Sequence, residues 1–439
     1  MSFPRYPKYK DSGVEWLGEV PEEWKVISMK WLSPVKRGAS PRPIDDPKYF
    51  DDEGEFAWVR IADVSACDGE LRETTQRLSE LGSSLSVKIQ PGELFVSIAG
   101  TVGKPCLSAV RACIHDGFVY FPDLQIDPKF LYRIFEGGTC YGGLGKWGTQ
   151  LNLNTDTIGS IRIALPPAEE LHHVLAFLDR ETAKIDGLVA EQRRLMELLK
   201  EKRQAVISHA VTKGLNPDAP MKPSGIEWLG DVPEHWEVLQ LKRIVEPGTS
   251  ITYGIVQAGP DIEDGIPYIR TSDMAGDSLP RTGYMRTSPE IDASYSRSKV
   301  KPNDLVVAIR ASIGKGLLVP DFLDGANLTQ GTARICPGKI LMPRFLFWSF
   351  NSDYCQTSIR AVAKGTTFLE ITLDALRRIP LAVPPLPEQA ELVELLDEEV
   401  ARLDTLVAEA QRAIDLLQER RTALVSAAVT GQIDVREFA

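Results

Sequence analysis

Basic side chains recur in pairs along this chain, at places where the surrounding sequence also recurs. Arg60 in WVRIADV is answered by Arg270 in YIRTSDM, and two lysine pairs behave in the same way, namely Lys104 with Lys315 and Lys146 with Lys364. The guanidinium of arginine can donate two parallel hydrogen bonds to guanine, whereas lysine mostly neutralises phosphate. These pairs are therefore candidate contacts to a nucleic acid, although a single surface charge is more often an ordinary solvated one.

Other basic and polar side chains extend this set of candidates. The further basic candidates are Lys36, Arg37, Arg42, Arg281, Arg286, Arg297, Lys299, Lys301 and Arg310. The polar candidates, able to donate or accept at base edges, are Thr149, Gln150, Gln257, Gln330, Thr366 and Thr367. Ordinary turn chemistry explains the polar residues almost as well. The interpretation therefore depends on the whole set.

Residue patterns for catalysis are weak. The five histidines are His115, His172, His173, His209 and His235, and the repeat-equivalent places of the last four hold Ala390, Glu391, Ala427 and Glu23. A metal or acid–base site common to both halves is therefore unsupported. Neither Gly-Lys pair has the earlier glycine of a phosphate-binding loop, and no Asn-Pro-Pro-aromatic motif of a methyltransferase is present. We predict no catalytic residues, no metal and no cofactor in this chain.

The elements that would position these residues are used twice. SGVEWLGEVPEEWKVISMKWL at 12–32 matches SGIEWLGDVPEHWEVLQLKRI at 224–244 with twelve identities in twenty-one positions. IQPGELFVSIAGTVGK at 89–104 is answered by VKPNDLVVAIRASIGK at 300–315, which predicts a turn, an apolar strand and a glycine-containing loop in each half. The segments 69–85 and 285–298 have no counterpart. One framework with different loops suggests two different recognition surfaces.

Each half ends in a long amphipathic segment. Apolar residues at three-and-four spacing predict one helix over 169–212 and another over 387–430, each behind a double proline. Forty-four helical residues span about 66 Å. We expect an antiparallel coiled coil with pseudo-two-fold symmetry that acts as a ruler between the globular parts. Its seam and the surface for partner subunits are assigned to Ile185, Leu188, Leu195, Leu199, Leu403, Leu406, Ile414 and Leu417.

The predicted fold class is α+β, with two tandem mixed α/β domains alternating with two long helices. The expected boundaries are 1–166 for the first domain, 167–216 for the first helix, 217–383 for the second domain and 384–439 for the second helix and tail. This order follows directly from the repetition.

Composition and charge restrict the possible classes of protein. The formal charge of −11 at first argues against a nucleic-acid partner, but the last segment, 384–439, carries 12 acidic and 5 basic residues and so holds most of the excess. Six cysteines without a CxxC pair suit reduced thiols in a cytoplasm. We find no apolar run of membrane-spanning length and expect no membrane association.

These motifs together resemble the specificity subunits of type I restriction-modification systems. The resemblance is carried by the doubled SG[VI]EWLGxVPExW segments, the YIR of Tyr268, the NLTQGTAR from Asn327, the KGTTF from Lys364 and the VPPLPEQ from Val383. It implies two target-recognition domains that each read half of a bipartite site in double-stranded DNA. It also implies two docked modification subunits that use S-adenosylmethionine to methylate adenine, and restriction subunits that use ATP and Mg²⁺. GTQL after Trp147 and IHDG from Ile114 depart from the family pattern in the first half.

The main hypothesis is a non-catalytic, sequence-specific DNA-recognition subunit. The alternative from another class is a protein-binding scaffold that uses the acidic second helix as a docking surface. A third possibility is an unrecognised nuclease, for which the purified chain alone would have to cleave DNA with a divalent metal.

Overall fold

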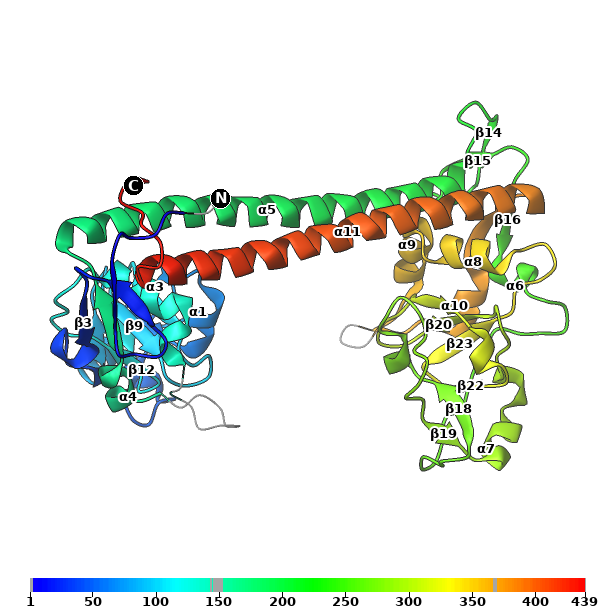
Figure 1. The fold of residues 1–439 in the computed structure, drawn as a ribbon. Helices are drawn as coiled ribbons and strands as arrows, with labels where there is room; N and C mark the ends of the chain where they lie inside the picture. Colours follow the sequence, from blue (N-terminus) through cyan, green and yellow to red (C-terminus); the bar gives the residue numbers. More distant parts are fainter. Residues whose placement is uncertain (1–2, 143, 145–152, 366–368, 439) are drawn as a thin grey trace. The chain divides into compact units, whose positions relative to one another are not determined.

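The computed structural model describes residues 3–142, 144, 153–365 and 369–438, which form two compact units. The first unit comprises 1–192 and 412–439, and the second comprises 193–411 (Figure 1). Each unit therefore contains a globular body and a portion of both long helices.

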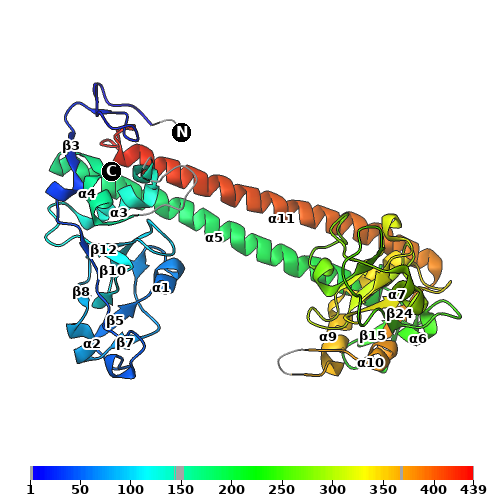
Figure 2. The same ribbon diagram turned by 90° about the horizontal axis from the view of Figure 1, so that it is seen from below.

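The body of the first unit is built on two sheets. The larger has the order β4 (Lys36–Arg37), β12 (Phe118–Tyr120), β9 (Leu94–Ser97), β10 (Pro105–Ser108) and β6 (Glu70–Leu71). The smaller has the order β7 (Arg77–Leu78), β5 (Phe56–Val59), β11 (Ala112–Ile114) and β8 (Val87–Ile89), seen in Figure 2 near α2 (Glu80–Ser84). Every residue of β5, β9 and β11 is buried. These strands are covered on both faces, which explains their continuous apolar sequences.

Shorter elements complete this body. Two antiparallel pairs join β1 (Tyr9–Asp11) to β2 (Glu19–Pro21) and β3 (Lys25–Ser28) to β13 (Arg162–Leu165). The other α-helices are α1 (Ile61–Ala66), α3 (Pro128–Gly137) and α4 (Thr155–Ser160). Buried residues of α3 share a core with the starting residues of the first long helix, so the helix is anchored on the body.

The second unit repeats this plan. Its larger sheet has the order β17 (Thr252–Tyr253), β23 (Thr332–Ile335), β20 (Leu305–Ala308) and β21 (Gly316–Leu318). Its smaller sheet has the order β19 (Arg286–Thr287), β18 (Ile266–Ile269) and β22 (Asn327–Leu328). The remaining pairs are β14 (Met221–Pro223) with β15 (Asp231–Pro233) and β16 (Glu237–Gln240) with β24 (Pro380–Val383).

The α-helices of this body are α6 (Leu241–Ile244), α7 (Pro289–Ser294), α8 (Pro343–Phe350), α9 (Asp353–Val362) and α10 (Leu373–Arg378). The strand β6 of the first unit comes from the segment 69–85, which has no counterpart in the second. The α7 helix comes from 285–298, which has none in the first. The predicted framework is therefore present twice, and the unmatched segments add different elements to it.

The two long helices are α5 (Ala168–Lys213), of 46 residues, and α11 (Leu386–Val429), of 44 residues. They run antiparallel within each unit. In the first unit α5 residues 174–178 share a core with α11 residues 425–429, and farther along α5 Asp186 meets Arg421. In the second unit Arg203 meets Asp404, while α5 residues 207–211 share a core with 392–400. The predicted helix ends are correct to about one residue.

The seam between α5 and α11 follows alternating four- and three-residue steps. Its buried or half-buried positions on α5 are Leu178, Thr182, Ile185, Val189, Gln192, Met196, Leu199 and Arg203. Those on α11 are Val400, Leu403, Val407, Ala410, Ile414, Leu417 and Arg421. This is a heptad spacing, in which positions a and d alone face the partner helix.

Of the eight residues assigned to the seam or the partner surface, three leucines lie outside the seam. Leu188, Leu195 and Leu406 are 47%, 44% and 41% exposed, whereas Ile185, Leu199, Leu403 and Ile414 are buried and Leu417 is half-buried. The three exposed residues lie one position beside a heptad site, which turns them out of the seam. No helix among the described residues is long and apolar enough to cross a membrane.

Candidate nucleic-acid interface

Polar side chains gather where two parallel strands of the first unit end. β5 and β11 run parallel, with Val59 opposite Ile114, so the following residues, Arg60 and His115, leave the sheet at the same edge. Both line a hollow of about 310 Å³ together with Ile44, Asp45, Phe50 and Trp58. The carboxyl ends of adjacent parallel strands are a common place for binding sites. This edge is the candidate interface of the first unit.

Arg60 is exposed and keeps its guanidinium accessible. Its backbone N–H donates to Asp63 Oδ2 at 2.8 Å, which caps the first turn of α1, and its Nη2 donates to Gln76 Oε1. The repeated Arg-x-x-Asp pattern is therefore partly a device for starting a helix. A neutral amide partner leaves the charge of Arg60 uncompensated, so this side chain suits a contact with a base or a phosphate.

Asp116 bonds two of the arginines that are predicted to contact DNA, Arg37 and Arg42. Arg37 Nε donates to the Asp116 carbonyl, and Arg42 Nη2 lies 3.3 Å from Asp116 Oδ2. Ser40 Oγ lies 3.1 Å from the other carboxylate oxygen. The loop after β4 is thus held against the loop after β11. Lys36, on β4, is exposed to solvent.

The second unit has an equivalent edge. β18 and β22 run parallel, with Ile269 opposite Leu328, so Arg270 and Thr329 leave the sheet together. Gln330 is exposed, and its N–H donates to the Ile255 carbonyl at 3.0 Å, which brings the segment of Gln257 beside it. Arg270 and Gln330 therefore follow the paired strands β18 and β22, and Gln257 lies two residues after Ile255, which bridges Thr329.

Arg270 differs from Arg60 in its partner. Its Nε and Nη2 donate to the two oxygens of Asp273, at 3.1 and 2.8 Å. The hydrogen bond with Asp273 raises the pKa of Arg270 above its usual value. Since this double bond occupies one side of the guanidinium, Arg270 has less capacity than Arg60 for a two-bond contact with guanine.

Lys104 and Lys315 have a structural role in common. Lys104 Nζ donates to the carbonyls of Ser65 and Cys67 at 3.1 and 3.0 Å, at the end of α1. Lys315 Nζ donates to the carbonyl of Ala275 at 2.9 Å, at the end of the 3-10 helix η4 (Thr271–Met274). A cation at the carbonyl end of a helix is stabilising. The repetition of these lysines is thus accounted for within each fold.

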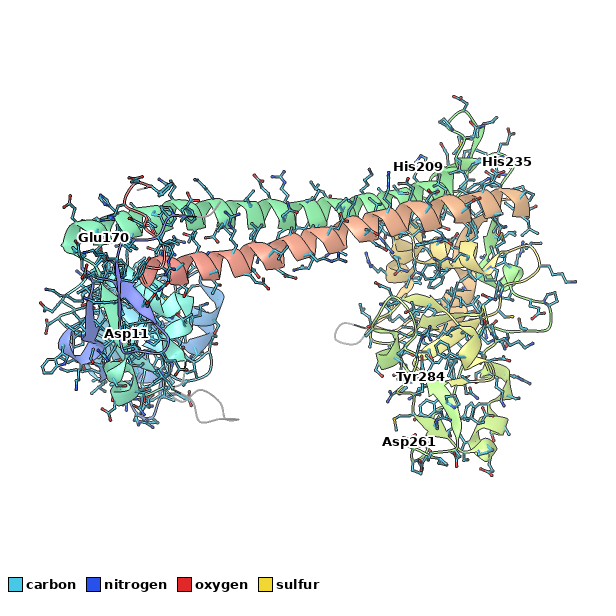
Figure 3. The ribbon with its side chains drawn as sticks, in the orientation of Figure 1. Asp11, Glu170, His209, His235, Asp261 and Tyr284 are labelled. Carbon is cyan, nitrogen blue, oxygen red and sulfur yellow. The ribbon has the colours of Figure 1, made fainter. Side chains whose placement is uncertain are left out.

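The remaining candidates are dispersed. Arg310 Nη2 lies 2.9 Å from Glu370 Oε1, and the backbone of Lys364 pairs with that of Glu370. Lys299 bonds the buried Asp292 at 2.5 Å, and Arg286 donates to the Gly265 carbonyl at 3.1 Å. Tyr284 and Asp261, labelled in Figure 3, lie in the same part of the second unit. Arg281, Arg297 and Lys301 are exposed, and Lys146, Thr149, Gln150, Thr366 and Thr367 lie outside the described residues.

The chain is similar to known proteins along most of its length. Residues 233–413 match the family described as "Type I restriction modification DNA specificity domain". Over 435 residues the chain is 29% identical to the type I restriction enzyme EcoBI specificity subunit of Escherichia coli, covering 96% of this chain and 89% of that one. Residues 233–413 thus match a type I restriction modification DNA specificity domain, and nearly the whole chain is similar to type I specificity subunits.

Solved structures with the same fold cover almost the whole chain. A chain from a study of complex assembly and conformational transition of the type I R-M system aligns with a TM-score of 0.70 at 17% identity, covering 93% of this chain and 98% of that one. The HsdS subunit from Thermoanaerobacter tengcongensis aligns with a TM-score of 0.50 at 16% identity, covering 94% of this chain and 98% of that one.

Three residues of these edges are not among the contacts predicted from the sequence, namely His115, Asp116 and Gln76. Gln76 lies in a segment without a counterpart. The same is true of a pair of glycines behind the two edges. A Cβ on Gly38 would lie 2.2 Å from the His115 carbonyl oxygen, and one on Gly254 would lie 2.0 Å from that of Leu328. The matching glycines could have revealed the close approach.

Proposed function

We propose that this specificity subunit reads an asymmetric, bipartite target in double-stranded DNA, one half-site with each body, and that it catalyses no reaction itself. The division into recognition domains at 1–166 and 217–383 and spacer helices at 167–216 and 384–439 is part of this proposal. The observation that carries it is the equivalence of the two strand edges, which present different side chains on the same framework. Different side chains at equivalent places would select different bases.

The proposed DNA contacts form two groups. One group binds phosphates and positions the protein, and the other reads base edges. Lys36, Lys364, Arg310 and the exposed arginines of the second unit are assigned to phosphates, whose attraction is independent of sequence. Arg60, Gln257 and Gln330 are assigned to base edges, because their donors and acceptors lie at the strand edges. Lys146, Thr149, Gln150, Thr366 and Thr367 are proposed as further contacts on sequence grounds alone.

The long helices are proposed as a spacer and as the docking surface for two modification subunits, with restriction subunits joining the assembly. Exposed leucines support this assignment. Leu188 and Leu198 on α5 are 47% and 52% exposed, and the repeat-equivalent Leu406 and Leu416 on α11 are 41% and 65% exposed. The same apolar side chains at equivalent places suit two copies of one partner. S-adenosylmethionine, ATP and Mg²⁺ are assigned to those partners.

The test is binding of duplex DNA by the chain assembled with its modification subunits. Mapping methylated adenines in the host genome first identifies the target. Gel shifts then compare this target with duplexes in which the first half, the second half or both halves are scrambled. Loss of at least tenfold in affinity for either single scramble is expected. Equal affinity for all four duplexes would refute the proposal and favour the protein-binding scaffold.

A further inference from the structure

The residues that follow β11 and β22 occupy equivalent places in the two units. Ile114 is opposite Val59 in one parallel pair, and Leu328 is opposite Ile269 in the other. The next strands agree, since Phe118 is opposite Ser97 and Thr332 is opposite Ala308. Counting from these registers places His115 and Asp116 where the second unit has Thr329 and Gln330.

We propose that His115 and Asp116 determine base preference in the first half-site, as Thr329 and Gln330 do in the second. This inference rests on the proposed recognition of DNA and assigns that role to two positions with different chemistry. A histidine next to an aspartate offers one donor and one acceptor, whereas a threonine next to a glutamine offers a hydroxyl and an amide. The two pairs therefore favour different base edges.

The orientation of His115 fixes which nitrogen can donate. The Gly117 N–H donates to His115 Nδ1 at 2.8 Å, so in the neutral ring the proton is on Nε2. Burial lowers the pKa of His115 and thus favours this neutral form. Its ring lies 4.7 Å from that of Phe118 and 6.0 Å from that of Trp58, between centroids, in a packed setting. His115 therefore presents one directed donor, suited to O6 or N7 of guanine or to O4 of thymine.

Asp116 supplies the acceptor. Its carboxylate is 43% exposed, with Arg42 and Ser40 on its oxygens at 3.3 and 3.1 Å. Phosphates repel a carboxylate that lies close to DNA. A hydrogen bond accepted from an exocyclic amino group of a base offsets this repulsion. Such groups are N4 of cytosine and N6 of adenine. Asp116 is therefore assigned to a position where the target has cytosine or adenine.

The second unit presents a different surface at this place. Thr329 Oγ1 lies 3.5 Å from the Ile269 carbonyl, and the exposed Gln330 follows it. Buried Asn327 holds the preceding strand, because its Nδ2 donates to Asp292 Oδ1 at 2.8 Å and its Oδ1 accepts from Ser298 at 2.6 Å. A glutamine amide can pair with N6 and N7 of adenine. The two half-sites are thus expected to differ at the base pair read here.

The experiment selects preferred duplexes from a library randomised in both half-sites, using the full chain assembled with its modification subunits. The variants are Asp116→Asn, the double exchange His115→Thr with Asp116→Gln, and Gln330→Ala. We expect Asp116→Asn to lose about tenfold in discrimination at one base pair of the first half-site. The double exchange should change the preferred base there, and Gln330→Ala should relax only the second half-site.

Arg42→Ala is the matched control, because it removes the partner of Asp116 and leaves the carboxylate in place. Weaker binding with unchanged base preference is expected for it. Selection of one unchanged first half-site by wild type, Asp116→Asn and the double exchange would overturn this inference and leave DNA recognition intact. A base preference changed equally by Arg42→Ala and Asp116→Asn would also overturn it, since Asp116 would then act through Arg42. Failure of the wild-type assembly to select any site would instead refute the proposed function.

Discussion

Arg421 on α11 donates through Nε to Asp186 on α5 at 2.8 Å in the first unit. In the repeat-equivalent pair of the second unit the arginine is on α5 and the aspartate is on α11. Arg203 Nε donates to Asp404 there at 2.9 Å. Each pair closes the heptad seam where the helices reach a globular body. The repetition in the sequence is therefore reproduced as a repeated contact.

The two pairs predict different losses of stability. Arg421 also donates to Glu136 Oε1 at 2.9 Å and is 24% exposed, whereas Arg203 is 32% exposed. We expect Arg421→Met to destabilise the first unit by about 1–3 kcal/mol, since it removes one of the two arginines that bond the half-buried carboxylate of Glu136. Arg203→Met should cost about 1 kcal/mol or less. Urea unfolding measures both losses, and hydrogen exchange of α3 and of the adjoining part of α11 reports the first. Equal losses would contradict this expectation.

A second prediction concerns the tryptophans that end the repeated VPEEW and VPEHW segments, Trp24 and Trp236. Trp24 Nε1 donates to Glu170 Oε1 at 2.9 Å, and the hydroxyl of Tyr6 donates to the same oxygen at 2.5 Å. Glu170 is buried near the start of α5 (Figure 3). Trp24→Phe removes one of these bonds and should destabilise its unit by about 1–3 kcal/mol beyond the lost ring area.

Trp236→Phe is the matched control for that substitution. Trp236 is equally buried, but its Nε1 has no hydrogen-bond partner within the described part of the chain. The repeat-equivalent acid, Glu388, bonds His235 at 2.8 Å instead. Thermal unfolding of the two variants should therefore show the larger decrease in Tm for Trp24→Phe. A larger decrease for Trp236→Phe would be inconsistent with the hydrogen bond to Glu170.

The two repeated arginines should respond differently in DNA binding. Arg60 bonds the neutral Gln76, whereas Arg270 is held at two points by Asp273. We expect Arg60→Ala to lose about 1–3 kcal/mol on the cognate first half-site only. Arg270→Ala should have the smaller effect on base preference. Titrations against cognate, half-scrambled and random duplexes test this; an equal loss on random DNA would make Arg60 a phosphate contact.

The exposed leucines of the helices predict the composition of the assembly. Leu188→Glu and Leu406→Glu each place a charge on an exposed position, so the chain should keep its Tm. We expect each single variant to lose one of two modification subunits and the double variant to lose both. Native mass spectrometry of the purified assembly gives the stoichiometry. Leu195→Glu is a comparison at an exposed leucine that does not recur, because the repeat-equivalent residue on α11 is Ala413. Unchanged stoichiometry in the double variant would reject this docking surface.

Acid should weaken the first unit through His115. Burial lowers the pKa of this imidazole, opposed by Asp116 and reinforced by the positive charge of Arg37. The unfolded chain binds the proton more readily, so this contribution to stability is complete above pH 6.5 and is lost as the pH falls below it. His115→Asn keeps an acceptor for the Gly117 N–H and should show a smaller decrease in Tm between pH 7.5 and 5.5. The same decrease in both proteins would contradict the assignment.

The sequence predicted the architecture well because its signals are periodic. Apolar spacing located α5 and α11 almost to the residue, and the doubled segments predicted the shared framework of the bodies. It did not separate Ile185 from Leu188, because three-and-four spacing on one helix is compatible with two neighbouring stripes. Only the partner helix decides which stripe is buried.

The candidate interface was harder to predict, because side-chain partners are set by the fold. Arg60 and Arg270 look equivalent in sequence, yet Gln76 comes from a segment with no counterpart and Asp273 lies three residues after Arg270. Asp116 lies in the IHDG segment that departs from the pattern of the second half, but an acidic side chain does not fit a pattern of basic contacts. The strand register aligns it with Gln330.

The glycines at 38 and 254 bear on how such a protein can diversify. Each lies so close to a main-chain carbonyl oxygen of a neighbouring segment that a methyl group cannot be accommodated. The main chain at each edge is consequently fixed in position, while the side chains projecting from it are free to be exchanged. New targets should thus arise more readily by point replacement at these edges than by lengthening them, and a laboratory search for altered selectivity should hold loop length constant.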